Sequence, residues 1–167
     1  MTVDPYYIDF LVSVLMKYPQ IFAIKYSNTL KSYVFSFMYQ GDLRGEQFES
    51  LKDKIISCFS VYEELNQCCK INLSFKKIPY KKSTFIEINV NGDSLCSQDI
   101  NLLASIMVVE LGDEIISDQD EIILNHYSSE DPEEREVEYL SREGLQNQNK
   151  ENLIVFRDAG KVYVFDK

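Results

Sequence analysis

The sequence has no tryptophan, one histidine, six glycines and four prolines among 167 residues. So little glycine and proline excludes collagen-like and low-complexity chains. The longest apolar stretch, residues 102–111, already contains Ser105 and Glu110, whereas a membrane-spanning helix needs about 18 or more apolar residues. The segment from Met1 to Pro5 has no cationic region of a secretion signal. We therefore expect a cytoplasmic protein with no membrane association.

Motifs for nucleotide and metal chemistry are also missing. Neither G-x-x-x-x-G-K-[ST] nor G-x-G-x-x-G occurs. Two of the four cysteines, Cys68 and Cys69, are adjacent, whereas zinc ligands are usually separated by two to four residues. Catalysis by His126 would need a nucleophile beside it in space, and no sequence pattern indicates one. We expect thiols rather than disulfides, no cofactor and no catalytic residue.

The chain nevertheless has the composition of a globular domain, with 45% hydrophobic and 26% charged residues. Ten Phe and eleven Tyr can fill a core, since each buried ring removes roughly 150–250 Å² from water. Apolar periodicity predicts helices over residues 5–18, 46–66, 98–111 and about 131–143, and strands over 20–26, 31–39, 71–76, 84–90, 153–156 and 162–165. Residues 113–125 fit either a short helix or a strand.

The predicted strands come in pairs rather than alternating singly with helices. That order favours the α+β class, with an antiparallel sheet built from three β-hairpins and helices packed on it. We expect one α+β domain over residues 1–127 and 150–167. Residues 128–149 would form an acidic helical appendage and a polar linker within it.

Negative charge is concentrated in one third of the chain. The whole chain has 27 acidic and 17 basic residues, and residues 110–143 contain 13 of the acidic ones but only two basic ones. Asp131 and Pro132 would begin the appendage helix. It would present its acidic and aromatic side chains to a basic surface of a partner protein: Glu133, Glu134, Glu136, Glu138 and Tyr139. The sequence thus predicts a non-catalytic protein-interaction or regulatory module.

An alternative function uses the carboxylates around residues 110–121. Glu110, Asp113, Glu114 and Asp118 recur at spacings of three and four, which group side chains on one helix face. Such a group could hold a hard cation in a cation-dependent hydrolase. A solvated acidic surface is the simpler interpretation.

A second alternative concerns a lysine-rich segment between two predicted strands. Lys76, Lys77, Lys81 and Lys82 surround Tyr80, a combination that can contact phosphates or single-stranded nucleic acid. The formal charge of −10 opposes approach to a polyanion. Lysines at a hairpin tip also discourage strand pairing, which is the interpretation we favour.

The first helix is a candidate dimer element. Tyr6, Phe10 and Val14 form an apolar strip on it, beside the stripe expected to face the domain's own core. Burial in that core is the equally weighted alternative.

Overall fold

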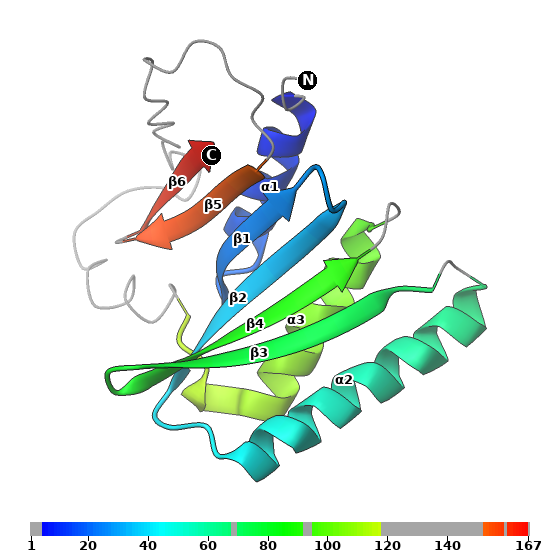
Figure 1. The fold of residues 1–167 in the computed structure, drawn as a ribbon, viewed down its shortest axis with the longest axis vertical. Coiled ribbons are helices and arrows are strands. Elements are labelled where there is room, and N and C mark those ends of the chain that lie inside the picture. The colour runs from blue at the N-terminus through cyan, green and yellow to red at the C-terminus, as the bar shows by residue number, and fades with distance from the viewer. Residues whose placement is uncertain (1–4, 68–69, 92–94, 118–151, 159, 167) are drawn as a thin grey trace, which may run out of the picture.

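The computed structural model describes residues 5–67, 70–91, 95–117, 152–158 and 160–166. These residues form an α+β fold (Figure 1). In chain order its elements are α1 (Pro5–Lys17), β1 (Ile21–Ser27), β2 (Ser32–Gln40), α2 (Gly45–Asn66), β3 (Asn72–Tyr80), β4 (Ser83–Asn91), α3 (Ser97–Leu111), the short 3-10 helix η1 (Gly112–Glu114), β5 (Asn152–Asp158) and β6 (Lys161–Asp166). The predicted fold class is confirmed.

The six strands form one antiparallel sheet in the order β3-β4-β2-β1-β5-β6. All three predicted hairpins are present, as β1–β2, β3–β4 and β5–β6. The hairpins are joined by pairing of β2 with β4 and of β1 with β5. The first hairpin therefore lies in the middle of the sheet, and β3 and β6 are its two edges.

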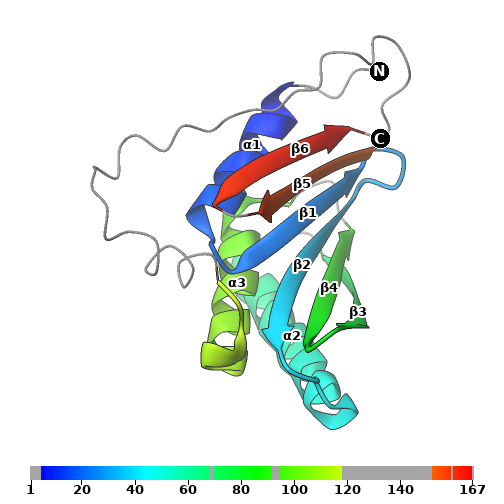
Figure 2. The ribbon, with the colours of Figure 1, turned by 90° about the vertical axis from the view of Figure 1, so that its left-hand side faces the viewer.

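The three described α-helices pack on the same face of the sheet. α1 contacts β1, β5 and β6, α2 contacts β3, and α3 packs beside α2. In Figure 2 the sheet is seen in front, with the helices behind it. The aromatic side of β2 faces these helices and is buried, as the alternation of the sequence predicts: Tyr33, Phe35, Phe37 and Tyr39.

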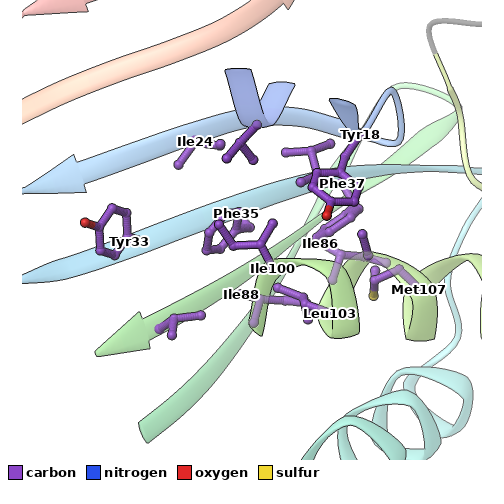
Figure 3. Close-up of a cluster of buried hydrophobic side chains, with 14 of the residues drawn as sticks. Tyr18, Ile24, Tyr33, Phe35, Phe37, Ile86, Ile88, Ile100, Leu103 and Met107 are labelled. Atoms are coloured by element: carbon purple, nitrogen blue, oxygen red, sulfur yellow. The ribbon is translucent and has the colours of Figure 1, made fainter. Parts of the chain in front are cut away.

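The core lies between this sheet face and the helices (Figure 3). Phe35 and Phe37 of β2 are fully buried, as are Ile86 and Ile88 of β4. Three buried residues of α3 pack on them: Ile100, Leu103 and Met107. Each such side chain contributes about 1.5–3 kcal/mol relative to leaving it exposed, so this contact fixes α3 on the middle of the sheet.

The buried stripe of α2 extends over about three turns and does not reach the end of the helix. The buried residues recur at spacings of three and four: Phe48, Leu51, Ile55 and Phe59. Tyr62 is only half-buried, and Leu65 is 78% exposed. The spacing of three and four in the sequence would continue the stripe to Leu65, and that expectation is wrong, because the last turn of α2 makes no such contact with the core.

The start of α3 also differs from the prediction. The hydroxyl of Ser97, just before the helix predicted over 98–111, would suit a cap, but Ser97 is the first residue of the helix and Cys96 is the N-cap. The buried carboxylate of Asp99 accepts a hydrogen bond from the Cys96 N–H at 2.9 Å. This bond satisfies a backbone donor at the positive end of the helix dipole.

Two buried polar side chains tie loops and helix ends to the sheet. The Thr84 hydroxyl of β4 donates to the Gly41 carbonyl oxygen at 2.9 Å and accepts from the Leu43 N–H at 3.2 Å. Arg157 of β5 donates to the carbonyl oxygens of Leu15 and Tyr18 at the end of α1. Positive charge and N–H donors are favourable there, because the last carbonyls of a helix lack partners.

After α3 the chain turns back to the sheet. η1 is followed by Ile115, which forms a bridge with Tyr39, and the Ile116 N–H donates to the Met38 carbonyl oxygen at 2.8 Å. The described part of the ambiguous segment 113–125 is therefore a short helical turn and a bridge. Residues 118–125 and the predicted helix at about 131–143 lie outside the described residues. None of the described helices is long and apolar enough to cross a membrane.

Candidate protein-interaction surface

The sheet face opposite the helices carries no helix in the described part of the chain. The strand registers and the ring contacts place one set of side chains on this face, which we call the open face. Its large apolar members are Phe22, Val34, Met38, Ile78, Tyr80, Phe85, Ile154, Phe156, Tyr163 and Phe165. A solvated face of an antiparallel sheet is ordinarily polar. The large number of apolar side chains on the open face therefore needs another explanation.

Six of these residues form two aromatic clusters. In the tip cluster, Phe85 lies 5.5 Å from Phe22 and 5.7 Å from Tyr80, measured between ring centroids. The tip cluster thus joins β1, β3 and β4 across the face. A β-bulge between Ile21 and Ala23 marks the position of Phe22 in β1, and bulges commonly redirect a side chain.

The second cluster, which we call the β6 cluster, lies at the other end of the sheet. The Phe156 ring of β5 lies 5.3 Å from those of both Tyr163 and Phe165 of β6, with interplanar angles of 19° and 4°. The three rings therefore stack along the last hairpin. Stacked or offset aromatic pairs contribute about 0.5–1.5 kcal/mol beyond area burial, so this hairpin presents a preorganised apolar surface.

Both clusters remain accessible. Tyr80 is 52% exposed and Phe165 is 47% exposed, while their cluster neighbours are half-buried. Exposed aromatic side chains that cluster in this way are candidates for a protein–protein contact or a ligand-binding site.

Several lysines lie on the open face or at its β3–β4 end. Lys25 and Lys76 lie on it, and Lys81 and Lys82 form the β3–β4 turn. Lys25 is paired with Glu87 at 3.1 Å, an ion pair that spans β2. The described side chains around the tip cluster thus carry a net positive charge.

The lysine-rich segment 76–82 is not the loop that the sequence predicts. β3 continues to Tyr80, so only Lys81 and Lys82 remain in the turn. Lys76 and Tyr80 lie on the open face, but Lys77 points to the helix side. The Lys77 ammonium donates to the Leu43 carbonyl oxygen at 2.9 Å. The alternation of an extended strand separates these side chains onto two faces.

The candidate dimer strip on α1 belongs in part to the core. Val14 is 5% exposed, and Phe10 is partly buried against the core cluster. The Tyr6 side chain lies outside the described ones. In the structure, Val14 and Phe10 therefore pack into the domain's own core.

The carboxylates proposed as cation ligands have other partners. Glu110 pairs with Lys54 of α2 at 2.5 Å, and Glu114 accepts a hydrogen bond from the Tyr39 hydroxyl. Asp113 is exposed, and Asp118 lies outside the described residues. Glu110 and Glu114 do line a common hollow of about 300 Å³ between α2 and the end of α3. Within the described ranges, no three His, Cys, Asp or Glu side chains are grouped closely enough to hold a metal ion.

Tyr39, which also lines this hollow, has a raised pKa. Its hydrogen bond to the Glu114 carboxylate raises the pKa of Tyr39 above 10.0, and burial and the negative charge of Glu114 act in the same direction. The effect keeps the phenol protonated. The protonated phenol donates to the Glu114 carboxylate, and both residues line the hollow.

The acidic appendage lies outside the described residues. Residues 118–151 contain 11 of the 27 acidic and three of the 17 basic residues. The predicted partner-binding residues all fall within this range: Glu133, Glu134, Glu136, Glu138 and Tyr139. His126, Cys68 and Cys69 also lie outside the described residues, whereas Cys58 and Cys96 are exposed free thiols.

Sequence reasoning missed most of the open face. Of the two clusters, only Tyr80 was among the candidate site residues, and Phe22, Phe85, Phe156 and Phe165 were not. One signal was present: residues 153–156 and 162–165 are apolar at almost every position. A strand with two apolar faces is typical of one covered on both sides, and here one side is uncovered among the described residues.

Comparison with known proteins gives no relative: no protein-family model, no curated protein and no solved structure matches the chain.

Proposed function

We propose that this protein is a non-catalytic interaction module that binds an apolar segment of a partner protein on its open face. The observation that carries the proposal is the open face itself. It gathers ten large apolar side chains, six of them in two aromatic clusters, on a side of the sheet that no described helix covers.

The composition of this face suits the centre of a protein interface. Aromatic residues and Met are enriched in interface cores, while charged residues are depleted there and lie at the rim. Met38 lies beside Phe85 across the β2–β4 pair, and Lys76, Lys81 and Lys82 lie near the tip cluster. Covering the exposed parts of Tyr80 and Phe165 would contribute roughly 25 cal/mol per Å² of apolar area.

The rim charges indicate the chemistry of the partner. Lys76, Lys81 and Lys82 lie close to Tyr80 in β3 and its turn. Acidic residues flanking the apolar segment of the partner would be steered toward them, which raises the association rate more than the affinity. The proposed occupant is therefore an apolar segment with Asp or Glu at its ends.

Single-stranded nucleic acid is the competing ligand, because Lys76 and Tyr80 share the open face. Two observations favour protein. Bases need accessible ring faces, but the Phe156 ring is stacked with both Tyr163 and Phe165. The charge of Lys25 is offset by Glu87.

Peptide display tests the proposal. Peptides selected from a random library against the full chain should be apolar with acidic ends. We expect Tyr80→Ala and Phe165→Ala each to weaken the binding of a selected peptide about tenfold or more, which corresponds to about 1.4 kcal/mol. Fluorescence anisotropy would measure the binding of the selected peptide to each variant. The matched control is Val109→Ala on α3, since Val109 is 78% exposed on the helix side.

The proposal would be refuted if all three substitutions weakened peptide binding equally, or if Tyr80→Ala and Phe165→Ala did not weaken it. Binding of a 15-nucleotide poly-dT with higher affinity than any selected peptide would also do so, in favour of nucleic acid.

For the acidic appendage we retain a separate proposal, made from its sequence: it binds a basic partner surface. Deletion of residues 128–147 should abolish binding of a lysine-rich probe peptide while leaving binding of the apolar peptides intact. Retention of lysine-peptide binding after the deletion would reject this role.

A further inference from the structure

The two edges of the sheet differ in how they resist strand pairing. The β3 edge carries Lys76 and Pro79, and such residues block edge-to-edge pairing in natural sheets. β6 runs from Lys161 to Asp166 with four apolar residues between them and no proline. The only charged residues of β6 lie at its two ends, so its four central residues carry neither a charge nor a proline that would block pairing at the outer edge.

On the outer edge of β6, Val162 and Val164 have no strand partner within the described part of the chain. β6 pairs only with β5 there, and it is the last strand in the sheet order. Asp158 and Lys161 flank the hairpin turn as a pair. Because hydrogen-bonded and non-hydrogen-bonded pairs alternate in an antiparallel ladder, the N–H and C=O groups of Val162 and Val164 are expected to point outward.

We propose that this edge pairs with the β6 edge of a second copy of the chain. The two strands run antiparallel about a two-fold axis and join two six-stranded sheets into one. A two-fold pairing removes both free edges at once and closes the assembly. The β3 edge, guarded by Lys76 and Pro79, stays at the outside of the joined sheet.

Side chains of a strand alternate between the two faces of the sheet, and this alternation restricts the register of the proposed β6–β6 pair. Directly opposed residues of antiparallel strands point to the same face, so Tyr163 of one copy must oppose an open-face residue of the second. The two central choices are Tyr163 and Phe165 of the second copy. Either one creates a cross-strand aromatic pair, and both extend the β6 cluster across the joint.

The size of the contact predicts its strength. One six-residue strand pair buries less than the roughly 1,200–2,000 Å² of stable interfaces. The dimer is therefore expected to dissociate on dilution.

Analytical ultracentrifugation of the full chain over a concentration series tests the pairing. Val164→Pro removes an outward-pointing donor, and the ring is tolerated at an edge, so this variant should stay monomeric at concentrations where the parent dimerises. Val164→Thr is the matched control, because it keeps the N–H and the β-branched shape, and it should dimerise as the parent does. Far-UV circular dichroism and urea midpoints establish that both variants fold.

A parent chain that remains monomeric at millimolar concentration, or a folded Val164→Pro variant that dimerises like the parent, overturns the proposal.

Cysteine crosslinking locates the contact independently of stability. Opposed residues in a non-hydrogen-bonded antiparallel pair lie about 4.5 Å apart between Cα atoms, within disulfide range. Tyr163→Cys alone, or mixed with Phe165→Cys, should give an oxidised dimer that the parent, with its exposed Cys58 and Cys96, does not give. Absence of any additional dimer in both samples counts against the β6 edge.

Discussion

Arg157 is the residue whose side chain most directly couples a helix to the sheet. It is buried in β5, and its guanidinium donates to carbonyl oxygens of Leu15 and Tyr18. Burial of a charge is costly unless hydrogen bonds compensate it, and the end of α1 supplies acceptors with a partial negative charge. The bond joins residues that are far apart in sequence, so it stabilises the tertiary fold rather than the helix alone.

Truncation of this side chain should therefore be costly. We expect Arg157→Ala to lower the free energy of unfolding by about 2–3 kcal/mol, the range for hydrogen bonds that involve a charged group. Arg157→Lys keeps the charge but loses the planar fork, and should lie between wild type and alanine. Urea denaturation measures both. A loss below about 0.5 kcal/mol in the alanine variant would show that α1 is held without this contact.

Tyr39 gives a prediction about pH. An unfolded Tyr titrates near 10, and the hydrogen bond to Glu114 raises the pKa of folded Tyr39 above that value. The stabilisation is therefore fully present below about pH 10 and is lost as the pH rises through the raised pKa. The stability difference between wild type and Tyr39→Phe should be constant from pH 7 to 9 and shrink toward pH 11.

Urea midpoints of the two proteins at each pH test this titration. Glu114→Gln is the control, because it removes the negative charge while keeping an acceptor. A wild type to Tyr39→Phe difference that does not change between pH 7 and 11 would contradict the assigned pKa direction.

At the scale of elements, local patterns predicted almost everything that depends on neighbours in sequence. The stripe from Phe48 to Phe59 gave α2, and alternation from Tyr33 to Tyr39 gave β2 with its buried side. Each hairpin also followed, since short turns join antiparallel strands. The pairings β2–β4 and β1–β5 could not be predicted from local patterns, because they depend on contacts between segments separated by whole helices.

The open face was harder to predict for a related reason. Alternation assigns Ile154 and Phe156 to one side of a strand and Leu153 and Val155 to the other, but both sides are apolar. Whether a helix covers a given side depends on how the helices distribute over the sheet. Here α1, α2 and α3 all lie on the side of Leu153 and Val155, so the other side became the candidate surface.

For the whole molecule, the described residues divide into a helix layer and an uncovered sheet face. The helix side buries the core, with Phe35 and Phe37 at its centre. The open face places the tip cluster at the β3–β4 end and the β6 cluster at the other. An interaction module needs a stable core on one side and accessible apolar surface on the other, and this two-layer arrangement provides both.

Photo-crosslinking of the full chain in its source cells tests the central claim most directly. A benzophenone amino acid would replace Tyr80 on the open face or Val109 on the helix face, both of which are more than half exposed. We predict a defined protein adduct from position 80 that a selected apolar peptide suppresses, and no such adduct from position 109. Adducts from position 109 alone, or adducts from position 80 that the peptide leaves unchanged, would contradict the assignment of the open face as the binding surface.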